Sequence, residues 1–175
     1  ALPWDFYGGI PEDQDEFGLN RYNTSVFGQF GEAMFEQVCL QCQPDFLVSS
    51  RDQWMSSAWE LKSPFRKYLK YVLMPTIDGE PQRIEWLDDY SQADVLLTYS
   101  QYGKDTLERE APGQIDVKGV VRPGVNPDIY KPMDKVHARQ QLGVPEDANV
   151  ILTVMRNQRR KLFPDMLDIF AKYVN

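Results

Sequence analysis

Four cations lie close together in a chain that is otherwise acidic. They are Arg156, Arg159, Arg160 and Lys161, and they follow the apolar run 150–154. The whole chain has 26 acidic and 19 basic side chains, with a formal net charge of −7. Arginine can bind phosphate oxygens in a bidentate manner, and lysine adds a compact charge. Two or three such cations beside a helix start would suit a diphosphate, although charge alone favours a solvated surface loop.

The expected place of this loop in the fold favours the same chemistry. Residues 149–155 are predicted as a buried strand and residues 163–174 as a helix. Ligands of open parallel sheets bind beyond the carboxyl ends of strands, where backbone amides at a helix start add positive potential. Because this loop has no glycine-rich phosphate motif, side chains would have to bind the phosphate. On charge alone, a solvated surface loop is the alternative.

The elements around this loop alternate between apolar strands and helices. The predicted strands are 44–50, 69–75, 94–100, 115–125 and 149–155. The predicted helices are 24–41, 53–68 with a break near Pro64, 82–93, 101–111, 136–143 and 163–174. Residues 1–23 are rich in Gly, Pro, Asp and Asn and are predicted as an irregular arm. Continuous apolar strands belong to a parallel sheet covered on both faces. The predicted fold is α/β, with a Rossmann-like, mainly parallel sheet flanked by helices.

The same pattern suggests two domains, the second of them incomplete. Residues 1–130 are predicted to form a partial N-terminal Rossmann-like domain. The stretch 126–149 holds three prolines and one short predicted helix, so an interdomain crossing is placed at 131–148. Residues 149–175 would then supply the first strand and helix of a second domain.

Composition excludes several classes of protein. Hydrophobic residues make up 42% of the chain and aromatic residues 13%, which is enough for a folded core. The acidic balance argues against a nucleic-acid binder, which needs a broad basic face. No apolar run reaches the length of a membrane-spanning helix.

The two cysteines form a C-x-x-C pair, Cys39 and Cys42. Such a pair can be half of a zinc site or a redox pair. The sole histidine, His137, lies far along the chain, and the pair falls near a predicted helix end before Pro44. Structural cysteines are therefore favoured and no metal is expected. Reduced thiols suit the cytoplasm, which is the expected location.

Longer stretches resemble a known family. The segments "VVRPGVNPDIYKP" and "ARQQLGVPEDANVILTVMRNQRRKLFPDMLDIFAKY" resemble the junction between the domains of glycosyltransferase group 1, the large retaining class with the GT-B fold. Upstream, "ADVLLTYSQYGKDTL" and "MPTIDGEP" resemble parts of the first domain of the same family. The resemblance covers roughly residues 44–174.

The resemblance implies a donor site. In that family two Rossmann-like domains face each other across a cleft, and the second domain binds a nucleotide-sugar. By this resemblance Arg156 and Lys161 contact the donor diphosphate, with Arg160 as a substitute for Lys161. Fixed cations there would stabilise the charge that develops on the leaving diphosphate, without a metal. The implied function is transfer of a sugar, of the hexosyl type, from a nucleotide-sugar donor to an unknown acceptor, with no cofactor.

The acceptor would lie against the first domain. Asp78 and Gly79 follow the strand 69–75 and could line the cleft, although a plain turn is the alternative. Ser100 could receive an anion or simply cap the next helix. Asp52 is the candidate catalytic residue, since it follows the earlier strand, where the family often has a histidine near the acceptor. The neighbouring Arg51 makes an ion pair as reasonable.

The chain also departs from the family pattern. Pro123 stands at the position of the family's turn histidine, and Met155 at that of its strand-end glycine. The family's later Glu-x7-Glu element and its glycine-rich opening strand have no counterpart in this sequence. We therefore expect an internal fragment that is inactive by itself.

An incomplete second domain has a physical consequence. A single strand-helix unit cannot bury both faces of its own strand. Residues 149–174 must then pack on the first domain, pair with a second copy as a homo-oligomer, or be poorly ordered. The alternative function is a non-enzymatic Rossmann-like module that binds a nucleotide or a protein.

Overall fold

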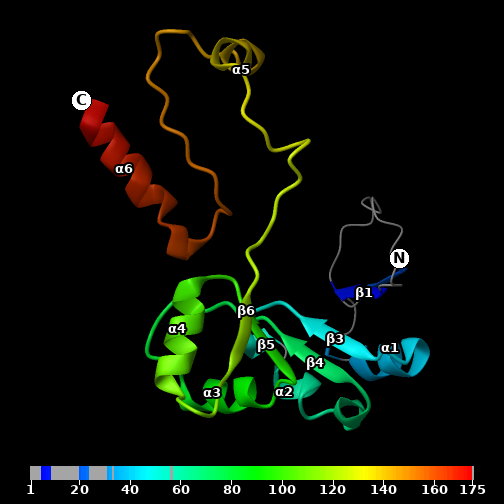
Figure 1. Ribbon diagram of the computed structural model, residues 1–175. Helices are drawn as coiled ribbons and strands as arrows, with labels where there is room; N and C mark the ends of the chain where they lie inside the picture. The colour runs from blue at the N-terminus through cyan, green and yellow to red at the C-terminus, as the bar shows by residue number, and fades with distance from the viewer. Residues whose placement is uncertain (1–4, 9–19, 24–30, 33, 56, 175) are drawn as a thin grey trace. The chain divides into compact units, whose positions relative to one another are not determined.

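The computed structural model describes residues 5–8, 20–23, 31–32, 34–55 and 57–174 (Figure 1). The chain divides into two compact units, residues 1–124 and residues 125–175. The first part of the predicted helix 24–41, residues 24–30, lies outside the described residues.

A short parallel pair of strands lies within the predicted irregular arm. Strand β1, Asp5–Gly8, pairs with β2, Asn20–Asn23. The prediction of an irregular arm is wrong for these two segments. Strands of four residues set among glycines and acidic residues are too short to show a clear apolar alternation.

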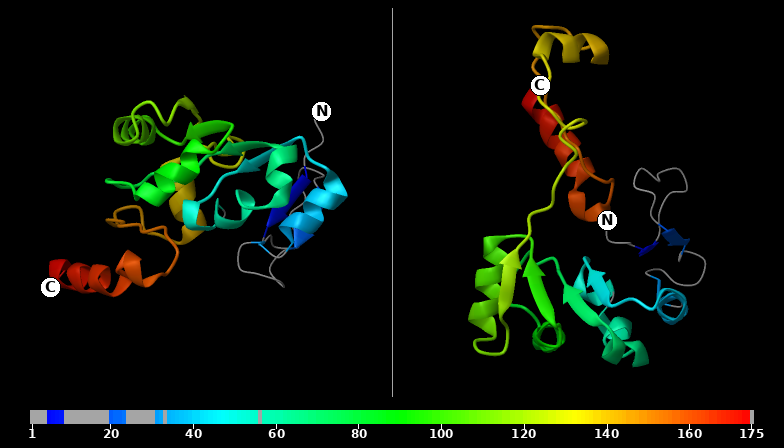
Figure 2. Two further views of the ribbon diagram at one scale, coloured as in Figure 1. Left: turned by 90° about the horizontal axis from the view of Figure 1, so that it is seen from below. Right: turned by 45° about the vertical axis from the view of Figure 1, so that its right-hand side comes forward.

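The main sheet of unit 1 has four parallel strands in the order β3-β4-β5-β6. The strands are β3 Phe46–Ser49, β4 Lys70–Leu73, β5 Val95–Thr98 and β6 Val117–Val120. All four fall inside predicted strands, and Figure 2 shows their arrows side by side. The predicted α/β class with a parallel sheet flanked by helices is confirmed. Every strand is parallel to its neighbours, so all the loops that follow the strands leave from the end of the sheet where the strands have their carboxyl ends. We call this end the carboxyl edge and the opposite end the amino edge.

Helices connect these strands. They are α1 Phe35–Cys42, α2 Ser57–Glu60, α3 Ile84–Ser91 and α4 Gln101–Glu110, with the 3-10 turns η1 Gln53–Met55 and η2 Pro64–Tyr68. Helix α4 packs along β5 and β6 (Figure 1). The predicted break near Pro64 is confirmed, because Ser63 caps a new turn there through an acceptor bond from the amide of Phe65.

The core lies against one face of the sheet. Side chains on this face are buried, among them Leu47, Tyr71, Leu73, Leu96 and Val117. They form one cluster with buried residues of three helices: Phe35 and Cys39 of α1, Leu87 and Tyr90 of α3, and Leu107 of α4.

The other face of the sheet is less covered than the sequence predicts. Phe46 and Val48 on the edge strand β3 are exposed, while Val72, Val95 and Leu97 are partly buried. The expectation of two fully covered faces is therefore wrong for the described residues. Buried residues of α1, α3 and α4, among them Phe35, Leu87 and Leu107, join the cluster on the opposite face.

Unit 2 contains the two helices that the sequence predicts there. Helix α5 spans Lys135–Leu142 and helix α6 spans Phe163–Val174, with the 3-10 turn η3, Arg159–Lys161, before α6. The carboxylate of Asp134 caps α5 by accepting a bond from the amide of His137. Gly143 ends α5 with φ of 65°, a left-handed conformation that suits glycine.

The predicted fifth strand is not formed. Residues 149–158 adopt neither helix nor strand, and Val150, Leu152 and Val154 are exposed, Val154 to 84%. A strand needs a neighbour to satisfy its backbone groups, and none of the described strands pairs with this segment. None of the described residues of α5, η3 and α6 is buried either. Unit 2 therefore encloses no core of its own within the described chain.

Candidate functional site

The carboxyl edge of the main sheet gathers the predicted residues of unit 1. Asp52 follows β3, Asp78 and Gly79 follow β4, and Ser100 follows β5. The strands are neighbours and parallel, so their following loops share this edge. The four residues thus follow strands as the sequence predicts, and their roles at a site stay predictions.

Two side-chain bonds tie the loops of this edge together. The hydroxyls of Ser50, after β3, and Tyr99, after β5, are hydrogen-bonded to each other. The amide of Gln53 donates to a carboxylate oxygen of Asp89 in α3. Gln53 is buried, so this second bond fixes the loop after β3 against the helix.

Asp52 and Asp78 are available for a ligand. Asp52 is partly buried and Asp78 is exposed. Within the described part of the chain, neither carboxylate has a hydrogen bond or an ion pair. Arg51 does not pair with Asp52 there; its guanidinium lies 5.9 Å from the ring centroid of Trp59. The expected ion pair is thus replaced by a cation–π contact.

Gly79 and Ser100 have structural roles. The Gly79 carbonyl accepts a bond of 2.5 Å from the side chain of Gln82, which fixes the turn after β4. The Ser100 hydroxyl accepts a bond of 3.1 Å from the amide of Gly103 and so caps α4. Of the two expectations for Ser100, the structure shows the cap.

Tyr90 is a residue of this region that the sequence did not point to. Its side chain is 1% exposed, and its hydroxyl has no hydrogen-bond partner among the described residues. Burial, and then the carboxylates of Asp89, Asp52 and Asp78 in that order, raise the pKa of Tyr90 above its usual range. Three carboxylates therefore contribute to the raised pKa of one buried phenol.

The basic loop lies in unit 2. Arg156, Arg159 and Arg160 are exposed and Lys161 is partly buried, the last three within η3. In residues 125–174 and the other described segments, none of the four side chains makes a hydrogen bond or an ion pair. No carboxylate of the described chain thus neutralises this loop.

The C-x-x-C pair lies at the end of α1. Neither cysteine forms a disulfide, and Cys39 is buried. Burial, followed by the nearby Cys42, Glu36 and Glu60, raises the pKa of Cys39 to about 11. A thiol in such surroundings is a poor nucleophile and a poor metal ligand, as the structural interpretation predicts.

The described residues lack two further features. They contain no group of three or more His, Cys, Asp or Glu side chains arranged to hold a metal ion. None of their helices combines the length and apolar character needed to cross a bilayer.

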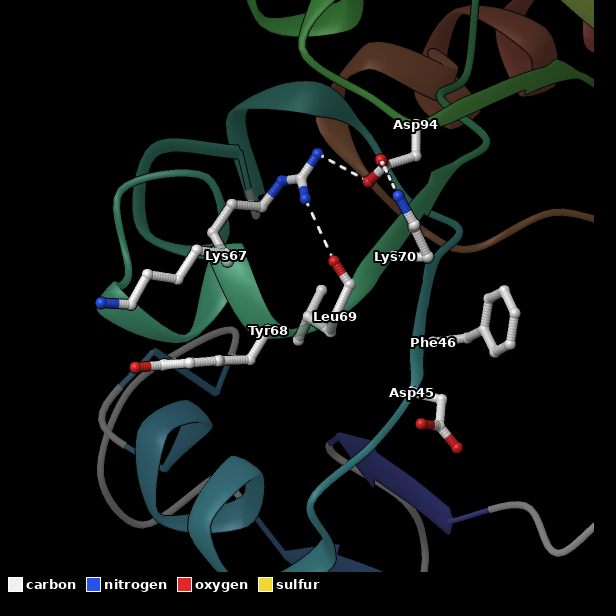
Figure 3. Close-up of a pocket in the computed structure, with 8 residues that line it drawn as sticks. Asp45, Phe46, Lys67, Tyr68, Leu69, Lys70 and Asp94 are labelled. Atoms are coloured by element: carbon white, nitrogen blue, oxygen red, sulfur yellow. Dashed lines mark hydrogen bonds and ion pairs between the residues drawn. The ribbon is translucent and has the colours of Figure 1, made fainter.

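A hollow of about 470 Å³ lies at the opposite, amino edge of the sheet (Figure 3). Its charged groups mostly bind each other. Asp94 pairs with Arg66 at 2.8 Å and with Lys70 at 3.2 Å. Figure 3 shows Lys70 turned toward Asp94, whereas the ammonium group of Lys67 points away. The charged groups of this hollow therefore form a structural ion cluster, and the hollow is not the predicted site.

A parallel α/β sheet with polar loops gathered at its carboxyl edge is the arrangement of Rossmann-like ligand-binding domains. Comparison with known proteins narrows this class. The chain is similar to curated proteins named D-inositol 3-phosphate glycosyltransferase. It is 48% identical over 91 residues to the one from a Nocardioides species, covering 52% of this chain and 18% of that protein.

Two further relatives carry the same name. The protein of Stackebrandtia nassauensis is 35% identical over 77 residues, which are 44% of this chain and 17% of the relative. That of Streptosporangium roseum is 46% identical over 57 residues, which are 33% of this chain and 12% of the relative. The chain thus matches less than a fifth of each relative's length. No family model matches it. These similarities support a relationship with the group 1 glycosyltransferases.

Proposed function

We propose that this chain is part of a glycosyltransferase that transfers a sugar from a nucleotide-sugar donor to an acceptor. The observation that carries the proposal is the similarity to curated glycosyltransferases, 48% identity over 91 residues in one case. The parallel sheet of unit 1 supports it, because folds of this kind bind ligands at the carboxyl edge. The alternative, a module without enzymatic activity, gains no support from relatives that are all named as enzymes.

In this proposal the basic loop of unit 2 binds the donor. Arg156 and Lys161 contact the diphosphate, and Arg160 can take the place of Lys161. This assignment is supported by the fact that no described carboxylate pairs with these three cations, so they are available to a ligand. As the bond between sugar and diphosphate breaks, negative charge grows on the leaving group. Cations held at that point stabilise the transition state more than the ground state.

The carboxyl edge of unit 1 receives the acceptor. Asp52 and Asp78 offer free carboxylates there, and Gly79 lies beside them without a side chain. Ser100 acts mainly through its cap on α4. The relatives' name contains D-inositol 3-phosphate, which makes this compound the first acceptor candidate to test.

Finer features belong to the same proposal. The transferred group is a hexosyl unit, the transfer retains its configuration, and the protein acts in the cytoplasm without a metal. The 175-residue chain alone should not turn over donor, because unit 2 has no buried residue in its described elements. A second copy could cover exposed apolar residues such as Ile151, Leu167 and Phe170 and form a homo-oligomer.

Titration calorimetry with nucleoside diphosphates tests the donor site. We expect the double variant Arg156→Ala, Lys161→Ala to bind at least about tenfold more weakly than the wild type, since each change removes a charge-assisted contact. The matched control is Lys135→Ala, Lys172→Ala, which removes two exposed lysines of the same unit. The experiment is best repeated in the full-length parent protein. Equal affinities of the wild type and the first double variant would remove the phosphate role of this loop.

A further inference from the structure

The carboxyl edge of unit 1 holds an unusual combination of groups around Tyr90. The Tyr90 ring is buried in the core, and its hydroxyl lacks a partner within the described chain. After burial, the negative charges of Asp89, Asp52 and Asp78 contribute to the raised pKa of that hydroxyl. They come from α3, from the loop after β3 and from the loop after β4. Three separate elements therefore each carry one of these carboxylates.

These carboxylates differ in how much hydrogen-bonding capacity they have left. Asp89 already accepts a bond from the buried amide of Gln53. Asp52 and Asp78 accept none from the described residues. An ionised carboxylate offers about four acceptor positions and no donor. The unused hydrogen-bonding positions of these carboxylates can therefore only accept bonds.

Within the described chain, none of the nearby cations pairs with Asp52 or Asp78. The guanidinium of Arg51 lies against Trp59, and that of Arg83 lies 5.2 Å from the ring centroid of Trp86. Arg109, farther along α4, is paired with Glu80. Arg122 is exposed, but it follows β6, two strands away from β4. The surface at the ends of β3 and β4 therefore carries two carboxylates with which no described cation pairs.

Such a surface selects among acceptors. Hydroxyl groups can donate to free carboxylates, and bonds to a charged partner are the stronger ones. A phosphate group would instead meet like charge and would gain no donor from Asp52 or Asp78. We propose, resting on the proposed function, that the acceptor is an unphosphorylated polyol whose hydroxyls donate to Asp52 and Asp78. This chain would then differ in acceptor from the relatives whose name specifies an inositol phosphate.

The test compares two probes that differ only in the phosphate. Binding of myo-inositol and of D-inositol 3-phosphate to the 175-residue chain is measured by titration and by saturation-transfer NMR. We expect the phosphorylated probe to bind at least about fivefold more weakly, because like charges face each other. Asp52→Asn and Asp78→Asn should each weaken binding of myo-inositol by about tenfold, since each removes a charged acceptor but keeps the side chain's shape.

A matched control tests whether these changes are specific to Asp52 and Asp78. Asp88→Asn removes the same charge from the exposed side of α3, next to Asp89 in sequence, and should leave both affinities unchanged. Near-ultraviolet circular dichroism of each variant shows whether the core around Tyr90 is intact.

The outcomes separate this inference from the glycosyltransferase proposal. Tighter binding of the phosphorylated probe, unchanged binding in both folded Asn variants, or binding of neither probe would overturn the inference. Nucleoside diphosphate binding depends on Arg156 and Lys161 and is measured in the same samples. Loss of polyol recognition with intact nucleotide binding rejects only the acceptor class. Polyol binding without nucleotide binding rejects the proposed donor site but is consistent with the proposed acceptor contacts at Asp52 and Asp78.

Discussion

Asp94 is the residue that joins most elements at the amino edge of the sheet. It accepts bonds from the backbone amide of Tyr71, at 2.9 Å, and from the ammonium of Lys70, and it pairs with Arg66. Arg66 in turn donates to the carbonyls of Leu69 and Gln92. The cluster therefore holds η2, β4 and the turn before β5 in register.

We predict that Asp94→Asn lowers the free energy of unfolding of unit 1 by about 1 to 2 kcal/mol. The estimate follows from the loss of charged hydrogen bonds, reduced by partial solvent exposure. Urea unfolding followed by tryptophan fluorescence measures it, because all four tryptophans precede residue 125. The control is Asp116→Asn, whose carboxylate pairs only with exposed Lys118 and should matter little. Equal effects of the two substitutions would contradict the role assigned to Asp94.

The same residue predicts a dependence on pH. The amide of Tyr71 first, and then Lys70 and Arg66, hold the pKa of Asp94 below its usual 3.8. A carboxyl with a lowered folded pKa stabilises the fold fully above its unfolded pKa and loses this contribution as pH falls through the folded value. The stability difference between wild type and Asp94→Asn should thus be constant near neutral pH and shrink below about pH 4. A difference that persists at the lowest pH would show that charge is not its source.

At the scale of elements, Ser100 determines where α4 begins. Its hydroxyl accepts a hydrogen bond from the amide of Gly103, one of the amides at the helix start that have no partner within the helix. We predict that Ser100→Ala destabilises unit 1 by about 1 kcal/mol. Ser91→Ala is the matched control, since the Ser91 hydroxyl is exposed at the end of α3 and donates only to the carbonyl of Asp88. A loss of acceptor binding with unchanged stability in Ser100→Ala would instead favour a direct ligand contact.

The elements of unit 1 could be predicted from the sequence because each strand is a continuous apolar run bounded by polar or proline residues. Four strands and the helices between them follow from this pattern alone. The fifth predicted strand, 149–155, has the same apolar composition but no strand beside it. Apolar composition shows that a segment can be buried, but not that a partner is present to bury it.

The candidate site could be predicted only in part. Residues that directly follow strands, such as Asp52 and Asp78, were placed on the correct edge by topology. Tyr90 was missed because it lies in the last turn of a helix, where its ring has the spacing of an ordinary core residue. Its hydroxyl has no partner among the described residues, and Asp52 and Asp78 act on its pKa from other elements. Both features depend on packing between elements, which no local pattern reveals.

At the scale of the whole molecule, the two units differ in how they are stabilised. Unit 1 has a continuous core that includes Tyr71, Leu73 and Leu107, each fully buried. The helices of unit 2 contain no buried residue among those described, and Leu152 and Val154 are exposed. Most stability of a domain comes from burial of apolar surface. The free energy needed to open the chain should therefore be much lower in unit 2 than in unit 1.

Limited proteolysis with trypsin measures this difference. We predict that cleavage after Arg156 and Arg160 is at least about tenfold faster than after Lys70 and Lys118, because the latter two lie in paired strands of the core sheet. Peptide masses taken over time identify each site. In concentrated urea the four sites should be cut at similar rates, which controls for local sequence preference. Equal rates under native conditions would show that unit 2 buries its apolar residues in solution. A second copy of the chain would then be the first explanation to examine, and the rates would depend on protein concentration.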